Sequence, residues 1–214
     1  MRCLMCGKEI AEEGFADLFR KPDVLCHTCR SNWKRIEQRF RFQGKPAYSI
    51  YAYEGGFSSC LLQYKECYDE ALKSVFLMQD RSQLRRMFHG RTLLLLPSSR
   101  EKEAERGFSH LRGMFEVLGL PMLEPFEKTD AASQKLRTRS ERRSMEHHIR
   151  LKNGVQLPRK VVLCDDVITT GATMRGALSA LPDGIDARIF ACARTVGKAK
   201  SRKGLRKELV IGKK

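Results

Sequence analysis

Residues 161–173 have the types and the spacing of an anion-binding site. The segment begins with Val161–Cys164, a short β-branched apolar run that predicts a buried parallel strand. Two carboxylates follow, then the threonine-rich turn Thr169–Thr173, and then a predicted helix from Met174 to Leu181. A strand that leads through a tight turn into a helix N-terminus brings unpaired backbone N–H groups and the positive end of the helix dipole together. We therefore predict that this turn binds a phosphate group.

The two carboxylates beside this turn cannot bind the same anion. They suit hydroxyl groups or a divalent cation next to it, so the implied ligand carries a phosphate at one end and a diol at the other. Gly171 permits a positive φ or a close approach of the backbone, and the threonines add hydroxyl donors. The alternative is a turn with solvated acids in which Thr173 is only an N-cap. The predicted ligand-binding residues here are Asp165, Asp166, Thr169, Thr170, Gly171, Ala172 and Thr173.

Four of the eight cysteines form two Cys-x-x-Cys pairs near the N-terminus, Cys3 with Cys6 and Cys26 with Cys29. Two residues between thiolates allow both to reach one metal ion, and two such pairs suit a closed tetrahedral zinc site. Gly7 follows the first pair, where a chain that wraps a metal often needs an unusual backbone angle. Disulfides are the alternative, but a reducing cytoplasm disfavours them. The sequence predicts a structural Zn²⁺ in a zinc ribbon.

The segment Ser31–Phe42 interleaves aromatic residues with cations. Aromatic rings among cations are typical of surfaces that stack the bases of a single strand and neutralise its phosphates. The alternative is a linker helix whose aromatics dock on the next domain. The aromatic residues are Trp33, Phe40 and Phe42, and the predicted nucleic-acid-binding cations are Lys34, Arg35, Arg39 and Arg41. Gly44-Lys45-Pro46 then marks a plausible domain boundary.

The net charge of +16 is spread unevenly over the 214 residues. Residues 46–127 are nearly neutral, with 10 Lys and Arg against 11 Asp and Glu, whereas residues 1–45 have 10 against 6. Residues 128–150 have 7 against 3, and the tail 197–214 has 8 against 1. Basic segments on a near-neutral body favour a polyanionic partner, most simply nucleic acid, although a generally basic surface would also fit. We see no secretory signal and no apolar run that could span a bilayer, which predicts a cytoplasmic protein.

The remaining pattern alternates strands with helices and predicts an α/β protein with a doubly wound, mostly parallel sheet. Leu93–Pro97 is a second buried-strand candidate, and the turn Ser98-Ser99-Arg100 after it falls at the same sheet edge as the phosphate turn. Those three residues are further ligand-binding candidates, because they would lie beside the phosphate turn, where a pyrophosphate group of the ligand would sit. We divide the chain into a zinc-ribbon domain at 1–45, an α/β domain at 46–196 and a basic, disordered tail at 197–214.

The strand, the two acids and the Thr-Thr-Gly-x-Thr turn resemble the phosphoribosyl pyrophosphate motif of type I phosphoribosyltransferases. This resemblance implies that Asp165 and Asp166 face the ribose hydroxyls and that residues 169–173 cradle the 5′-phosphate. Together with the paired cysteines, Arg106-Gly107-Phe108 and the arginine-rich run after Gln134, the chain is similar to the ComF family of competence proteins over residues 1–196. The resemblance implies a zinc motif fused to a phosphoribosyltransferase-type domain.

It also implies a role in transformation, in which the protein handles incoming single-stranded DNA alongside a membrane-associated helicase or translocase. Two other functions stay open: an active phosphoribosyltransferase that uses Mg²⁺ and phosphoribosyl pyrophosphate, and a ligand-sensing regulator without turnover. The tail resembles a phosphate-binding extension more than a base-reading hood, which favours the accessory role. The further cations assigned to nucleic-acid binding, or to the leaving pyrophosphate in a transferase, are Lys135, Arg137, Arg142 and Arg143.

Overall fold

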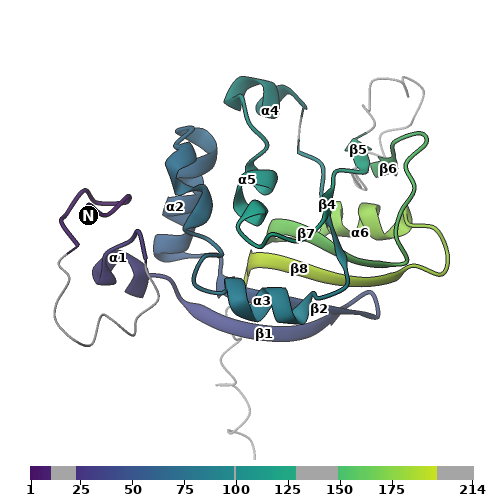
Figure 1. Cartoon of the computed structure of the whole chain (residues 1–214), viewed down its shortest axis with the longest axis horizontal. Helices are drawn as coiled ribbons and strands as arrows, with labels where there is room; N and C mark the ends of the chain where they lie inside the picture. Colours follow the sequence, from purple (N-terminus) through teal and green to yellow (C-terminus); the bar gives the residue numbers. More distant parts are fainter. Residues whose placement is uncertain (11–22, 99, 129–148, 197–214) are drawn as a thin grey trace, which may run out of the picture.

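The computed structural model of the chain describes residues 1–10, 23–98, 100–128 and 149–196. Its centre is a six-stranded sheet in the order β1-β2-β8-β7-β3-β4 (Figure 1). Four of the five strand pairings are parallel, and β1 alone runs antiparallel to its neighbour β2. The predicted α/β class with a mostly parallel sheet is therefore confirmed. The strands of this sheet are β1 (Arg35–Phe42), β2 (Lys45–Ala52), β3 (Thr92–Leu95), β4 (Met122–Leu123), β7 (Lys160–Ile168) and β8 (Asp186–Arg194).

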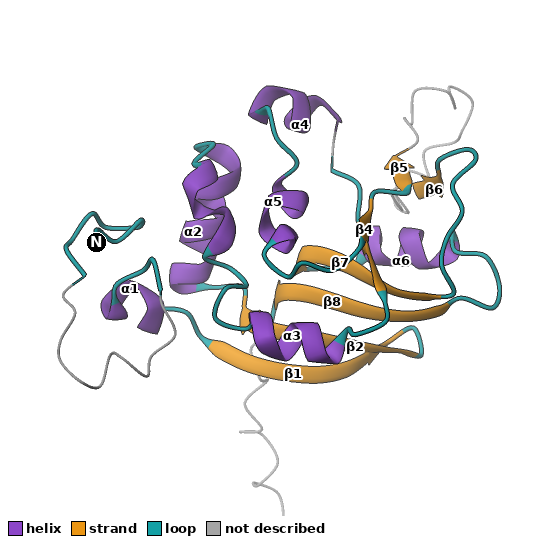
Figure 2. Ribbon diagram, viewed as in Figure 1, coloured by secondary structure: helices purple, strands orange, loops and turns teal. Residues whose placement is uncertain are grey.

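Short helices connect these strands, as Figure 2 shows, and a separate two-stranded sheet lies beside the main one. The helices are α1 (His27–Ser31), α2 (Gly55–Glu66), α3 (Arg81–Met87), α4 (Arg100–Arg106), α5 (His110–Glu116) and α6 (Ala172–Ser179), with a 3₁₀ turn, η2, at Glu70–Ser74. The small sheet pairs β5 (Phe126–Lys128) with β6 (Ile149–Leu151) in antiparallel fashion. Its two strands flank residues 129–148, which lie outside the described part of the chain.

The core is built on the three central strands, whose sequences are continuous apolar runs. Leu93–Leu96 and Val161–Cys164 are fully or almost fully buried, as parallel strands covered on both faces require. Phe190 at the middle of β8 contacts the rings of Phe88, Phe115 and Tyr48. This packing fixes the strand ends from which the candidate site projects.

The segment predicted as an aromatic platform or a linker helix forms the edge strand β1. It joins β2 through a tight hairpin in which Gln43 and Gly44 both have positive φ. The domain boundary that we placed after residue 45 thus falls inside this hairpin, and β1 is part of the main sheet. Trp33, just before β1, is buried against Tyr51, Phe57 and Phe76, so it belongs to the core.

Candidate functional site

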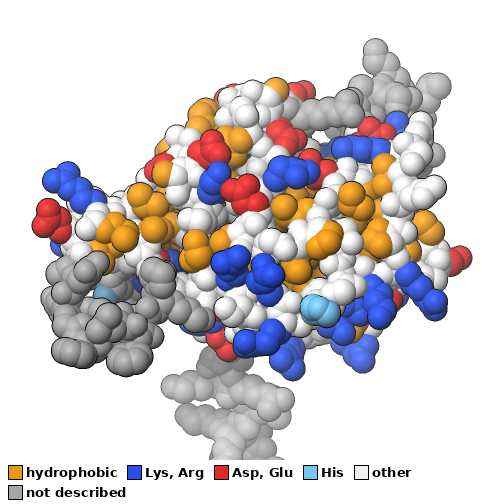
Figure 3. All heavy atoms as spheres, in the orientation of Figure 1, with side chains coloured by type: hydrophobic (Ala, Val, Ile, Leu, Met, Phe, Trp, Pro, Cys, Tyr) orange, Lys and Arg blue, Asp and Glu red, His pale blue; other side chains and the backbone are white. Residues whose placement is uncertain are grey.

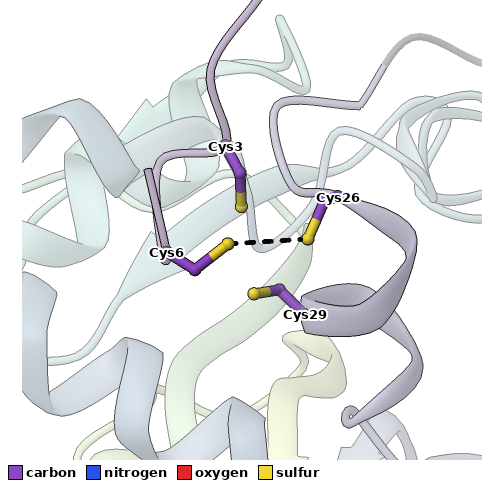
Figure 4. Close-up of side chains that lie close together, drawn as sticks. All are labelled: Cys3, Cys6, Cys26 and Cys29. Carbon is purple, nitrogen blue, oxygen red and sulfur yellow. Dashed lines mark hydrogen bonds between the residues drawn. The ribbon is translucent and has the colours of Figure 1, made fainter. Parts of the chain in front are cut away.

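The four predicted metal ligands come together in one cluster (Figure 4). Their sulfur atoms all lie within 4.8 Å of one another and point toward a common centre. A tetrahedral zinc ion with Zn–S distances of about 2.3 Å requires sulfurs about 3.8 Å apart, and Cys6 Sγ lies 3.7 Å from Cys26 Sγ. The cluster therefore fits a four-thiolate metal site.

The backbone around Cys3 favours the thiolate that such a site needs. Burial alone would raise the pKa of this thiol, but backbone hydrogen bonds from Cys26, Cys6 and Met5 outweigh burial and lower the pKa from 9.0 to about 6. The turn closes through a hydrogen bond from Gly7 N to Cys3 O, and Gly7 has the predicted positive φ, at 70°. Metal ligands must be deprotonated, so Cys3 is well placed as a ligand, whereas burial and the neighbouring cysteines raise the pKa of Cys29.

Arg30 ties the cysteine cluster to the α/β core. It follows Cys29 in α1, pairs with Asp23 at 2.6 Å and donates to the Val75 carbonyl at 3.0 Å. Its guanidinium also lies 4.4 Å from the centre of the Trp33 ring. The cysteine segment is therefore packed against the sheet domain rather than separate from it.

The predicted phosphate turn forms a pocket at the carboxyl end of β7, lined by Asp165 and residues 167–174. Gly171 is the N-cap of α6 and has a φ of 76°. Inside the turn, Ala172 N donates to Thr170 Oγ1 at 3.4 Å, and Arg175 Nη1 donates to the Thr170 carbonyl at 2.9 Å. Thr169 and Thr170 are exposed, which leaves this turn accessible to a ligand.

Gly171 is also held by a residue far away in sequence. A Cβ at this position would lie 2.6 Å from two ring atoms of Phe42, at the end of β1. The aromatic ring thus packs directly on the turn, and only glycine satisfies both the positive φ and this contact. The sequence did not predict that β1 reaches the phosphate turn.

The strand that carries the two carboxylates is longer than predicted. We expected it to end at Cys164, but β7 continues to Ile168 because β8 supplies hydrogen-bond partners along this whole length. Asp165 and Asp166 are thus successive residues within a strand, and successive side chains of a strand point to opposite faces. The two acids consequently have different surroundings.

Asp166 is buried and lies in a network of polar side chains on the α2 and α5 side of the sheet. Its Oδ2 is 2.5 Å from Lys65 Nζ and 3.1 Å from His110 Nε2. Burial alone would raise the pKa of this carboxyl, but the hydrogen bond from His110 and the charge of Lys65 outweigh burial and lower it. Asp166 is therefore an ionised carboxylate whose Oδ2 contacts both Lys65 and His110.

Asp165 faces the phosphate pocket. Its Oδ1 accepts a hydrogen bond from Asp166 N at 2.9 Å, and its side chain is partly exposed. Burial away from water is the main cause that raises the pKa of Asp165 well above 3.8, and repulsion from the charge of Asp166 is the second. Lys128 on β5 lies close enough for Asp165 to raise the lysine's pKa, although burial of Lys128 lowers that pKa more. Of the two acids, Asp165 is the one placed to meet a ligand in this pocket.

His110 links Asp166 to the turn after β3. Its Nδ1 lies 3.2 Å from both Ser98 Oγ and Arg106 Nη1. An arginine can only donate, so Nδ1 accepts and Nε2 carries the proton that is donated to Asp166. Burial lowers the pKa of His110 despite the Asp166 carboxylate. Neither His110 nor Lys65 was among the predicted site residues, because each reaches Asp166 only through the packing of α2 and α5 on the sheet.

The other predicted residues are only partly described. Ser98 is half-buried at the turn after β3; Ser99 and the side chain of Arg100 lie outside the description. The same holds for Lys135, Arg137, Arg142 and Arg143 and for the tail 197–214. The backbone of Arg100 begins α4, so a helix follows the predicted turn at once.

The four predicted cations near β1 fall into two groups. Lys34 pairs with Glu54 at 2.8 Å, and Arg35 binds Asp80 at 2.7 Å and also pairs with Glu37. Arg39 and Arg41 are exposed, and Arg41 Nη1 donates a hydrogen bond to the Gly44 carbonyl. Arg39 and Arg41 are therefore the better placed of the four to meet a partner.

The strand β1 separates its aromatic rings from its arginines. Phe40 contacts Arg194, whose guanidinium lies 4.2 Å from the ring centre, and Phe42 contacts Gly171. Arg39 and Arg41 occupy the alternate positions and so project from the other face of the sheet. An aromatic platform interleaved with cations requires both sets on one face, and a strand does not provide this.

Comparison with known proteins finds two similar proteins with the same name. No protein-family model matches the chain. Competence protein ComFC of Streptococcus pneumoniae is 29% identical over 199 residues, which cover 81% of this chain and 90% of that protein. Competence protein ComFC of Bacillus subtilis is 25% identical over 210 residues, which cover 84% of this chain and 88% of that protein.

The described residues contain no helix that is both long enough and apolar enough to cross a membrane. The similarity to each of these two proteins covers more than four fifths of this chain. The resemblance predicted from the sequence is thereby confirmed, and the chain is a relative of the ComFC competence proteins.

Proposed function

We propose that this protein is an accessory protein of DNA uptake in natural transformation and that it binds single-stranded DNA. The observation that carries this proposal is the similarity to two competence proteins along most of both chains. The excess of cations over acids, +16 in total, supports a polyanionic partner. A helicase or translocase of the uptake machinery is the protein partner that we expect, and it would bring a cytoplasmic protein to the membrane.

In this proposal the pocket after β7 binds a ligand of the phosphoribosyl pyrophosphate type, or a nucleotide-like strand end. The turn 169–173 supplies backbone N–H groups and hydroxyls for the phosphate, and Asp165 lies beside it for a ribose hydroxyl or Mg²⁺. Asp166 does not bind the ligand itself in this proposal. Its carboxylate contacts Lys65 and His110 and holds these two side chains in position. The cysteine cluster holds a structural Zn²⁺.

The DNA-binding part of the proposal is tested with a labelled single-stranded oligonucleotide and the full chain. We expect an unlabelled single strand to displace the label at lower concentration than a duplex of equal length. The variant R39Q/R41Q should bind more weakly, because it removes two exposed cations of β1. Equal displacement by single strand and duplex would contradict a single-strand function.

An active phosphoribosyltransferase is the second candidate, and the placement of Asp165 in the phosphate pocket favours it. The test measures pyrophosphate release from phosphoribosyl pyrophosphate with a panel of bases and amines and Mg²⁺. Our proposal expects binding of phosphoribosyl pyrophosphate by calorimetry, weakened in D165N, without turnover at ordinary enzyme rates. Turnover with any acceptor would make the protein an enzyme, and ligand binding without any DNA binding would favour a ligand-sensing regulator.

A further inference from the structure

Two segments of the chain that are far apart in sequence contain cations and no carboxylate. Residues 38–48 contain three Lys or Arg, and residues 81–91 contain four. Neither segment contains Asp or Glu. The first segment covers most of β1 and the start of β2, and the second covers α3. Five arginines of the two segments are exposed: Arg39, Arg41, Arg81, Arg85 and Arg86.

The fold brings these two segments together on one face of the sheet. Arg39 is the cross-strand neighbour of Tyr48, so the two side chains lie on the same face. Gln83 of α3 donates to Tyr48 Oη at 3.2 Å, which places α3 over β2 directly beside Arg39. Arg188 of β8 donates to the Met87 carbonyl at 3.1 Å and fixes the other end of α3.

Figure 3 shows how the charged side chains are distributed on this face of the molecule. Lys and Arg side chains gather in the lower half, over α3 and β1, whereas most Asp and Glu side chains lie above them. Within the described residues, none of the five arginines has an ion pair; Arg85 and Arg41 donate only to the carbonyls of Leu118 and Gly44. Glu37 and Asp80, the acids that directly precede the two segments in the sequence, are both paired with Arg35. No acid of the described residues therefore neutralises the positive charge of this surface.

We infer that the exposed arginines of α3 and β1, here called the α3–β1 surface, form the path for the phosphate backbone of single-stranded DNA. This inference rests on the proposed function and assigns it a surface that includes α3. Arginine binds phosphate through two parallel hydrogen bonds, and exposed arginines without a carboxylate partner release counterions when phosphates take their place.

The composition of the surface argues against other partners. Neither segment supplies any of the exposed large apolar side chains of the described residues, so the surface has no anchor for a bilayer and no apolar centre for a protein interface. It also lacks an exposed aromatic ring for base stacking, since Phe40 and Phe42 project from the opposite face. Binding here should depend on phosphates and not on base identity. A flexible single strand can follow a helix and a strand that lie on one sheet more easily than a rigid duplex can.

The test compares R81Q/R86Q with the matched control R112Q/R150Q, which removes the same charge from exposed arginines of α5 and β6. Fluorescence anisotropy measures the affinity of the full chain for labelled oligo-dT and oligo-dA between 0.05 and 0.5 M salt. Each lost phosphate contact makes the negative slope of log affinity against log salt less steep by about 0.7, and two lost contacts lower the affinity about 25-fold at 0.1 M salt. We expect this loss in R81Q/R86Q with both oligonucleotides and an unchanged slope in the control.

The outcomes separate this inference from the proposed function. If the parent protein does not bind single strands at all, the proposed function fails. If the parent binds with a salt-dependent affinity but R81Q/R86Q behaves like the parent, or both variants lose the same slope, the α3–β1 surface is not the path. A parallel titration uses vesicles of phosphatidylserine and phosphatidylcholine; loss of vesicle binding in R81Q/R86Q with unchanged DNA affinity would assign the surface to a membrane instead. Equal unfolding midpoints of the three proteins exclude misfolding as the cause.

Discussion

At the scale of single residues, the two adjacent aspartates of β7, just before the phosphate turn, have different roles. Asp166 is an ionised carboxylate held by Lys65 and His110, and Asp165 lines the pocket with a raised pKa. A one-residue step along a strand is enough to separate them, because it reverses the face. Asp166 consequently supports the fold and the position of its neighbours, while Asp165 is available to a ligand.

This difference predicts that D166N, but not D165N, destabilises the protein. D166N leaves the charge of Lys65 without its buried partner, and breaking a buried pair in this way costs about 3 kcal/mol. D165N removes a carboxylate whose charged form is disfavoured in the fold, so it should leave the free energy of unfolding unchanged or raise it. Urea unfolding at pH 7 measures both, and equal destabilisation by the two variants would contradict the assignment.

His110 predicts a dependence of stability on pH. Its pKa lies below 6.5 in the folded protein, so the unfolded chain takes up a proton at a higher pH than the folded one. The stability that neutral His110 contributes is therefore complete above about pH 6.5 and is lost as the pH falls through the lowered value. H110Q should flatten the unfolding free energy over this window relative to the parent, as measured by urea titrations at several pH values. The same slope in both proteins would mean that another group is responsible.

At the scale of elements, the phosphate turn depends on contact between α6 and the edge strand β1. Gly171 combines a φ of 76° with a Cβ position only 2.6 Å from the Phe42 ring. Gly154 has almost the same φ, 75°, with nothing within 4 Å. These two glycines separate the cost of the backbone angle from the cost of the steric contact.

We expect G154A to destabilise the protein by about 1 kcal/mol, the cost of a left-handed backbone angle, and G171A to cost clearly more. Adding F42A to G171A should recover part of the excess, because the smaller side chain makes room for the methyl group. Thermal unfolding of the four variants, including F42A alone, gives the coupling energy. No coupling between positions 42 and 171 would contradict the contact.

The sequence predicted the elements well where one continuous pattern carries the signal, as in the buried strand at 161–164 and the turn 169–173. It failed where the answer depends on partners from elsewhere in the chain. The segment 31–42 has no pattern that separates an edge strand from a helix, and its pairing with β2 decides the matter. Lys65 and His110 reach Asp166 only through the packing of α2 and α5, which no local spacing encodes.

At the scale of the whole molecule, charge summed along the chain concealed a charged surface. Residues 46–127 are close to neutral, yet Arg81, Arg85 and Arg86 lie together on α3, and three of the acids lie together at 101–105. The fold places the α3 cations beside Arg39 and Arg41. The cysteine cluster could be predicted from spacing alone, whereas its attachment to the core through Arg30 and Trp33 could not.

That attachment makes Trp33, the only tryptophan, a reporter for the metal site. It is buried, and Arg30 beside Cys29 covers its ring. Removing the metal with a chelator, or replacing Cys6 in C6S, should loosen this segment and shift the tryptophan emission to longer wavelength. The control C67S changes an exposed cysteine outside the cluster and should leave the emission and the bound zinc unchanged. An unaltered spectrum after complete metal loss would contradict the coupling between the cluster and the core.

The central claim, that this relative of the competence proteins binds single-stranded DNA through phosphate contacts, is tested most directly by the salt dependence of its affinity. Anisotropy of a labelled single strand, titrated with the full chain at increasing salt, should give a straight line of log affinity against log salt with a slope of about −0.7 for each phosphate contact. With the five arginines of the α3–β1 surface engaged, we expect a slope of about −3.5. Absence of binding at low salt, or an affinity that does not change with salt, would contradict the account.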